Sequence, residues 1–356
     1  MDEAERRLGH RLPADLRALY LMADGDGVGH DHRHLFGQAW LSLESMVAES
    51  TGWGAAERPW YGWDLEWDAI VHDASPADTV RRCGGHPGWL RFASGEDGNF
   101  LAVDMAPARA GHPGQVIATG RDYQDGPAYL TDSLTSLLGQ RLELLDQGAY
   151  EKYDDHIALF PPDPGPPPRE FVGGPIPEEV PPTLQAIHVN DVTGLVDLSP
   201  LTAAPQLRRL HLNRCATADL SPVRDLPVED LRVTLADGDL APLQAHPHLT
   251  SLSLTSTAPT DIAVLRTLPR LRSLDLSGAD VPGLPALADL PGLRYLSLDA
   301  RQWNSFLNDA EPPPTLAAAR LAGPDVSLDD ALAWAARLGI DTDDTVRVTG
   351  TLRRRA

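Results

Sequence analysis

The chain has 356 residues and a formal net charge of -21, with 51 acidic side chains against 30 basic ones. Hydrophobic residues make up 42% of it, which is typical of globular domains, and the length favours two of them. No apolar run is long enough for a membrane-spanning helix, and the charged start MDEAERRLGH does not resemble a signal peptide. Because the negative charge repels phosphate backbones, we expect no nucleic acid as partner. Without a membrane-spanning run, we also expect no membrane.

The two cysteines, Cys83 and Cys215, lie in different halves of the chain. They are too few and too far apart for a disulfide framework or a zinc ligand set. We therefore expect a reducing, cytoplasmic compartment, and neither a structural metal nor a cofactor.

The first half begins and ends with helical patterns and has strand patterns between them. Residues 1–8 and 13–22 are predicted helices, and the second has apolar side chains at three- and four-residue spacing. The short runs WLRFAS, NFLAVDM and GQVIATG are predicted strands separated by glycine-rich turns, followed by a helix at 131–146. This order predicts an α+β domain, an antiparallel sheet with flanking helices.

Two stretches of this half carry a family resemblance. The opening LGHRLPADLRALYLMADG resembles the start of the SUKH superfamily, and WLRFASGEDGNFLAVDMAPARAGHPGQVI is similar to its centre. The resemblance covers about residues 1–153. It implies a Smi/Knr-type domain, as in fungal cell-wall regulators and bacterial immunity proteins that bind toxins, with no catalytic residues. On the matched positions we expect Trp89 in the core, Asn99 at a positive-φ turn position and Asp104 capping a turn.

A tryptophan-rich insert at residues 53–69 is not part of that family pattern. Its rings either pack into the domain's own core or contact a partner, while its acids would attract a basic protein. The candidate contacts are Trp53, Trp60, Tyr61, Trp63, Glu66, Trp67 and Asp68.

Two clusters could suggest enzyme chemistry. Alternating histidines at 30–34 could converge on a divalent ion, although no carboxylate-rich second motif supports them. Cys83 lies near His86, but a catalytic pair also needs an orienting third group. We interpret both as plain loops and predict no catalytic residue.

The second half is a repeat. Segments such as LRRLHLN, LTSLSLT and LRSLDLS recur every 21–23 residues with apolar side chains at offsets 0, 3 and 5. This is the L-x-x-L-x-L core of a leucine-rich repeat, whose stacked units share one core. The Asp-Leu-x-Pro-Leu segments between them predict irregular or 3₁₀ turns on the convex side. The units resemble bacterial repeats of the internalin type, and a degenerate seventh unit is expected at Leu316.

The predicted organisation is a SUKH-like domain at 1–155, a proline-rich linker at 156–183, repeats at 184–310 and a repeat cap at 311–356. In the cap, residues 324–338 predict a helix with Ser327 as N-cap. Offsets 2, 4 and 6 of each repeat should point outward and form a concave binding face. The candidate contacts there are Arg209, His211, Arg232, Tyr295 and Trp303.

These features predict a non-enzymatic protein-binding protein, of the immunity type, that sterically neutralises a basic toxin domain. A regulatory scaffold that bridges two cellular proteins is the alternative, and a metal-dependent enzyme is a weaker one.

Overall fold

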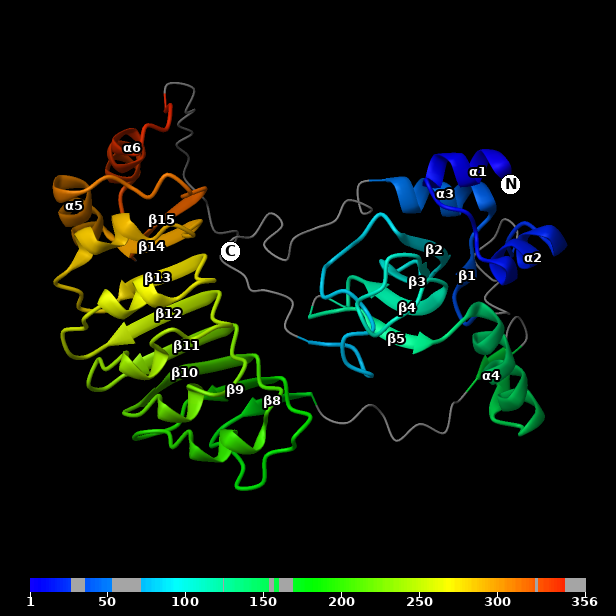
Figure 1. Cartoon of the computed structure of the whole chain (residues 1–356), viewed down its shortest axis with the longest axis horizontal. Coiled ribbons are helices and arrows are strands. Elements are labelled where there is room, and N and C mark those ends of the chain that lie inside the picture. Colours follow the sequence, from blue (N-terminus) through cyan, green and yellow to red (C-terminus); the bar gives the residue numbers. More distant parts are fainter. Residues whose placement is uncertain are drawn as a thin grey trace, which may run out of the picture. The chain divides into compact units, whose positions relative to one another are not determined.

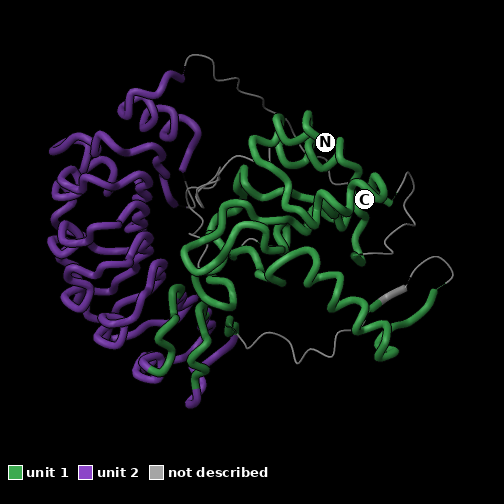
Figure 2. The backbone as a smooth tube through the Cα atoms, turned by 45° about the vertical axis from the view of Figure 1, so that its right-hand side comes forward, with its two compact units in different colours: residues 1–172, 180–187, 203–209 green, residues 173–179, 188–202, 210–356 purple. Residues whose placement is uncertain are grey.

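The computed structural model describes residues 1–26, 36–52, 72–123, 125–153, 157–159, 169–323 and 326–342. Figure 1 shows its helices and strands, and Figure 2 its two compact units. Unit 1 comprises residues 1–172, 180–187 and 203–209, and unit 2 comprises residues 173–179, 188–202 and 210–356. Within the described ranges, no helix is both long and apolar enough to cross a bilayer.

An antiparallel sheet forms the centre of unit 1, with strand order β1-β2-β3-β4-β5 (Figure 1). The turn between β2 and β3 needs Gly98, whose φ of 95° is in the left-handed region that favours glycine. The three predicted strands are thus confirmed as β2, β3 and β4. The strands are β1 (Ala39–Trp40), β2 (Trp89–Ser94), β3 (Asn99–Asp104), β4 (Gln115–Gly120) and β5 (Ala128–Thr131).

Among the described residues of unit 1, four helices accompany this sheet, and α3 adds to the three that the sequence predicted. Ser42 and Ser133 cap α3 and α4, because their side chains accept hydrogen bonds from the amides of Ser45 and Ser136. The helices are α1 (Asp2–Leu8), α2 (Ala14–Met22), α3 (Leu43–Thr51) and α4 (Leu134–Asp146). A small antiparallel pair, β6 (Tyr150–Lys152) and β7 (Ile157–Leu159), follows α4.

The two faces of this sheet belong to different hydrophobic clusters. Leu101 and Val103 of β3 join the large cluster that contains helix residues such as Leu16 and Leu134. The intervening Ala102 joins a smaller cluster with Trp89, Ile117 and three residues from the 74–83 loop. Alternation along the strands thus buries both faces, one beneath helices and the other beneath a loop.

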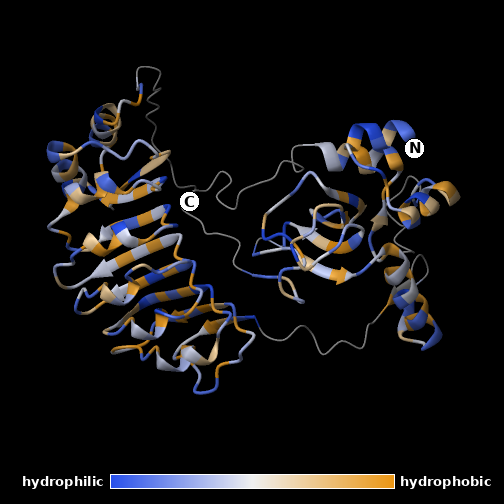
Figure 3. Ribbon diagram, in the orientation of Figure 1, coloured by the Kyte–Doolittle hydropathy of each residue, from blue (hydrophilic) through white to orange (hydrophobic). Residues whose placement is uncertain are grey.

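Unit 2 is a leucine-rich solenoid with a parallel sheet. The eight-stranded sheet has the order β15-β14-β13-β12-β11-β10-β9-β8, and the sequence repeat predicted a strand for each unit from β9 to β15 but not β8. Neighbouring strands are in register, so Leu231, Leu252, Leu274 and Leu296 stack side by side in the core. Apolar and polar residues alternate along these strands (Figure 3). The strands are β8 (Glu170–Gly173), β9 (Ala186–Asn190), β10 (Arg209–Thr217), β11 (Asp230–Leu235), β12 (Ser251–Ser256), β13 (Ser273–Gly278), β14 (Tyr295–Asp299) and β15 (Ala318–Ala322).

Short 3₁₀ helices return the chain from strand to strand, as predicted for the Asp-Leu-x-Pro-Leu segments. In four repeats the Asp side chain accepts a hydrogen bond from the amide two residues later: Asp197, Asp219, Asp239 and Asp261. Each carboxylate therefore satisfies an amide at the start of its turn. The 3₁₀ helices are η1 (Ser199–Ala203), η2 (Ser221–Val223), η3 (Ala241–Leu243), η4 (Ala263–Thr267) and η5 (Leu284–Asp289).

Two helices flank β15, which is the predicted seventh unit. Asp299 and Gln302 form a capping box at the start of α5 (Ala300–Asp309), and the Gln302 amide also donates to the Leu276 carbonyl at 2.9 Å. The predicted tail helix is α6 (Leu328–Arg337), with Ser327 accepting from the Asp330 amide. In the proline-rich segment, β8 is an edge strand of the sheet, and none of its own residues is a proline.

The histidine-rich residues 30–34, the tryptophan-rich insert and the tail beyond residue 342 lie outside the described residues.

His246, in the turn after η3, is a buried titratable side chain of unit 2. Its ring is 2% exposed, Nε2 lies 2.9 Å from the Leu226 carbonyl oxygen, and Nδ1 accepts from the Leu249 amide at 3.2 Å. Burial lowers the pKa of His246 from 6.5. Below that pH the unfolded chain takes up a proton that the folded ring resists, so we predict that the free energy of unfolding falls.

Chemical denaturation of the wild type and His246→Gln between about pH 7.5 and 5 checks this prediction. The stability advantage of the wild type over the variant should shrink as the pH falls. A constant advantage over that range would contradict it.

Candidate protein-interaction surface

The outward side chains of the solenoid strands form a regular surface, which we call the strand face. Its first column contains Asp230, Ser251, Ser273 and Tyr295, which the register aligns from β11 to β14. Its middle column continues through Arg232, Ser253, Asp275 and Ser297. Alternate residues of each strand thus build columns that run across the sheet.

The first column is buried, which the sequence did not predict. Asp230 is 2% exposed, Ser251 and Ser273 are each 7%, and Tyr295 is 6%. Two contacts contribute to this burial: Asp230 is hydrogen-bonded to His211, and the register places the large Tyr295 ring beside the small Ser273. The exposed part of the strand face is therefore narrower than three full columns.

A chain of polar contacts joins β9, β10 and β11 on this face. His211 and Asp230 are both buried, with 2.7 Å between Nε2 and Oδ2. The rings of His188 and His211 meet edge to face, with 4.8 Å between their centroids. Such a network holds its side chains in fixed positions before any partner arrives.

A second polar column runs beside this chain of contacts. The Asn213 side chain donates to the Asn190 side-chain oxygen at 2.9 Å. Both residues occupy offset 6 of their repeats, one of the outward positions, but neither is among the contact residues predicted from the sequence. This offset was the signal that could have found them.

A hollow of about 320 Å³ lies over these columns. Arg232 is exposed at its edge, and Arg214 pairs with Asp191 at 2.6 Å between Nη2 and Oδ2. The Arg214 hydrogen bond lowers the pKa of Asp191, which keeps the pair ionic. The hollow is lined by Asn190, Leu212, Asn213, Arg214, Arg232, Val233, Thr234, Ser253 and Thr255. It is a surface for hydrogen bonds and charges.

The five contact residues predicted for the repeats differ in how far they are exposed. Arg232 is exposed, whereas Arg209 is 7% exposed and donates from Nη1 to Asp125 at 2.8 Å. His211 and Tyr295 are buried in the strand face as described. Trp303 is 1% exposed and donates from Nε1 to a backbone carbonyl, so its ring packs inside the solenoid. Of these five, only Arg232 presents an exposed side chain.

The seven candidates of the tryptophan-rich insert lie outside the described residues, so their contacts stay predictions. Within the described residues, His, Cys, Asp and Glu side chains form no group of three or more that could hold a metal ion. Cys83 and Cys215 are both buried, and they are not joined by a disulfide bond.

In unit 1, most of the residues that carry the family resemblance have structural roles. Trp89 is 1% exposed, and Asp104 accepts at Oδ1 from the Ala106 amide at 2.8 Å, as expected of a turn cap. At Oδ2 it accepts from the Gln115 side chain at 2.9 Å, while burial raises the pKa of the Asp104 carboxyl. The expectation for Asn99 was wrong, because Asn99 begins β3 and the left-handed position belongs to Gly98.

The fold thus defines an α+β unit joined to a leucine-rich solenoid with a polar strand face. Residues 1–140 match the model of the SMI1/KNR4 family, SUKH-1, and therefore form an SMI1/KNR4-type domain.

Two curated relatives are similar to part of the chain. The cell wall biosynthesis/cell cycle regulator smi1 of Schizosaccharomyces pombe is 35% identical over 128 residues, which is 34% of this chain and 25% of the relative. A glucan synthesis regulatory protein of Neurospora crassa is 27% identical over 151 residues, which is 35% of this chain and 28% of the relative. The chain spans about a quarter of the length of each.

Solved internalin structures of Listeria monocytogenes are also similar to part of this chain. Internalin C2 is 20% identical with a TM-score of 0.30, covering 44% of this chain and 68% of the internalin. The internalin inlF is 21% identical with a TM-score of 0.31, covering 48% of this chain and 58% of the internalin.

The buried pair of His211 and Asp230 should stabilise the solenoid. We predict that Asp230→Ala lowers the free energy of unfolding by about 1–3 kcal/mol, because His211 then loses its partner inside the protein. Ser253→Ala, on the same face and half-buried, is the control and should change it by less than about 0.5 kcal/mol. Urea denaturation followed by circular dichroism measures both, and equal effects would contradict the role given to the pair.

Proposed function

We propose that this chain is a non-enzymatic protein-binding protein of the immunity type, which neutralises a toxin domain by covering its active surface. The observation that carries the proposal is the strand face, an open and polar surface whose side chains are held by contacts between neighbouring strands. The SMI1/KNR4 match at residues 1–140 supports it, since the resemblance of this half to SUKH proteins implies protein binding.

Binding to a prearranged surface loses little side-chain freedom. His211, Asp230, Asn190 and Asn213 already have their hydrogen-bond partners, so a partner need not order them. Arg232 at the edge of the hollow offers a planar guanidinium to carboxylates or carbonyl oxygens. Inhibition is steric and needs no reaction at the surface.

The charge of the whole chain favours a basic toxin domain. A net charge of -21 attracts a positively charged partner over distances of about 10 Å and speeds its encounter with the chain. The proposal includes the acidic and aromatic insert at residues 53–69 as a second contact. It also places the chain in the cytoplasm, and two buried cysteines that are not joined by a disulfide bond are consistent with a reducing compartment.

A regulatory scaffold is the second candidate function. The curated relatives are named as a cell wall biosynthesis/cell cycle regulator and a glucan synthesis regulatory protein, and this favours regulation. In that role each unit would bind a different cellular protein. The two candidates differ in whether one partner is toxic alone or two partners bind at once.

Co-expression with toxin domains encoded beside this chain tests the proposal. We predict that the full chain restores growth, and that the purified complex weakens as salt rises because charges steer it. In the same complex, Arg232→Ala should weaken binding about tenfold, as expected of an exposed arginine at a contact.

Arg224→Ala is the matched control, since Arg224 is exposed at the end of η2, outside the strand face. It should leave the dissociation constant within about twofold. If no neighbouring toxin domain binds while two cellular proteins bind together, the scaffold replaces the immunity function. Equal losses in Arg232→Ala and Arg224→Ala would exclude the strand face as the contact.

A further inference from the structure

Unit 1 contains a cavity of about 850 Å³ beside the loop that covers the second face of its sheet. Val80 and Cys83 in its wall also belong to the small hydrophobic cluster under that face. The cavity is lined by Asp73, Asp78, Val80, Arg81, Arg82, Cys83, Pro107, Ala108, Arg109 and Arg208. Its size is within the range of sites that hold small ligands or a few side chains.

A buried network fixes the two loops that carry the arginines. The Gln115 side chain donates from Nε2 to the Asp104 carboxylate and to the Thr79 carbonyl, both at 2.9 Å. The amide of Ala110 donates to the Asp78 carbonyl at 2.8 Å. The loop after β3 is therefore tied to the 78–81 segment, and the cavity between them has a defined wall.

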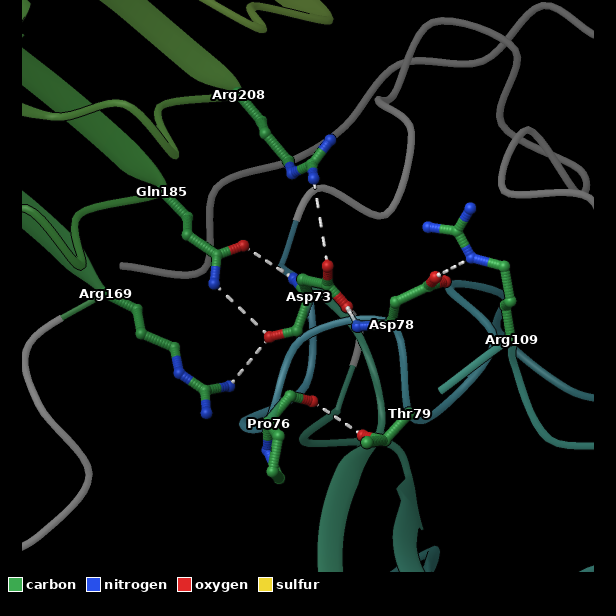
Figure 4. Close-up of polar contacts among 8 residues, drawn as sticks. All are labelled: Asp73, Pro76, Asp78, Thr79, Arg109, Arg169, Gln185 and Arg208. Atoms are coloured by element: carbon green, nitrogen blue, oxygen red, sulfur yellow. Dashed lines mark hydrogen bonds and ion pairs between the residues drawn. The ribbon is translucent and has the colours of Figure 1, made fainter. Parts of the chain in front are cut away.

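The lining carries four arginines against two aspartates, an excess of positive charge in a chain of net charge -21. Arg109 donates from Nε to Asp78 Oδ2 at 2.9 Å, and Arg208 lies 3.8 Å from the Asp73 carboxylate (Figure 4). Arg81 uses Nε for the Ala106 carbonyl at 2.7 Å. The bonds of Arg81 and Arg109 thus engage Nε and leave the terminal nitrogens as donors.

The Asp73 side is already occupied by contacts within unit 1. Figure 4 shows Gln185, Arg169 and Arg208 pointing toward Asp73, while Arg109 approaches Asp78. The Asp73 main-chain oxygen accepts from Arg169 at 3.1 Å and from Gln185 at 3.3 Å. An incoming anion would therefore meet the guanidinium groups of Arg81 and Arg109, the most exposed donors of the lining.

We propose that this cavity binds a short oxyanion-bearing peptide segment of a partner protein, either a run of carboxylates or a phosphorylated side chain. Guanidinium groups pair with both oxyanions through two parallel hydrogen bonds. The negative charge elsewhere on the chain repels extended polyanions, so the cavity selects a short segment. This contact is separate from the strand face and does not depend on the partner being a toxin.

Fluorescence anisotropy of the full chain with labelled hexaglutamate, a phosphoserine peptide and neutral hexaglutamine tests the proposal. At least one anionic peptide should bind at low salt at least about tenfold tighter than hexaglutamine. Binding by hexaglutamate alone identifies carboxylates as the ligand, and binding by the phosphoserine peptide alone identifies phosphate. Equal affinity for all three peptides would overturn the proposal.

The double variant Arg81→Gln/Arg109→Gln should weaken the anionic peptide about tenfold. Arg6→Gln/Arg121→Gln is the matched control: it removes the same charge from two exposed arginines of unit 1, and β4 separates Arg121 from the cavity end of the β3–β4 hairpin. Equal weakening by both double variants would overturn the proposal.

A further variant distinguishes loss of the binding site from loss of folding in the arginine variants. Asp78→Asn removes a competing carboxylate, and asparagine tolerates the φ of 59° at this position. It should tighten binding of the anionic peptide several-fold, which a misfolded chain could not do. Unchanged or weaker binding would count against the cavity.

Discussion

One repeat of the solenoid cannot bury its own leucines, and this constraint shapes unit 2. Leu231, Leu252 and Leu274 are each at most 1% exposed only because the neighbouring strand brings its leucine into register beside them. Backbone hydrogen bonds between these parallel strands set their spacing at about 4.8 Å. The same register therefore positions every outward side chain, and the strand face follows from the core.

Polar side chains from neighbouring repeats meet because of this spacing. His211 contacts Asp230 on the neighbouring strand, Asn213 donates a hydrogen bond to Asn190, and Arg214 pairs with Asp191. The pair of His211 and Asp230 satisfies groups that would otherwise lose hydrogen bonds on burial. Arg214 and Asp191, by contrast, pair at an exposed position. The resulting surface is polar, and its paired side chains have hydrogen-bond partners on neighbouring strands.

Local patterns predicted most of the architecture, because the repeat period, the Asp-Leu-x-Pro-Leu turns and the Ser327 cap depend on neighbouring residues. The residues of the candidate site were harder to predict, since burial of their side chains depends on contacts between segments that are distant in the sequence. Trp303 was expected at the surface, but it packs against Trp334 with 5.5 Å between ring centroids, a contact that no short-range period reveals. The arginine-lined cavity of unit 1 likewise gathers residues from separate loops, which local spacing does not bring together.

Native-state hydrogen exchange of the full chain carrying Leu252→Ala tests most directly whether the repeats share one core. Truncating this buried side chain lowers the free energy of unfolding by about 2–5 kcal/mol. If stacking holds the sheet, amides of the adjacent strands β11 and β13 should lose protection together with those of β12. Faster exchange confined to β12 would contradict a shared core, and with it the origin of the strand face.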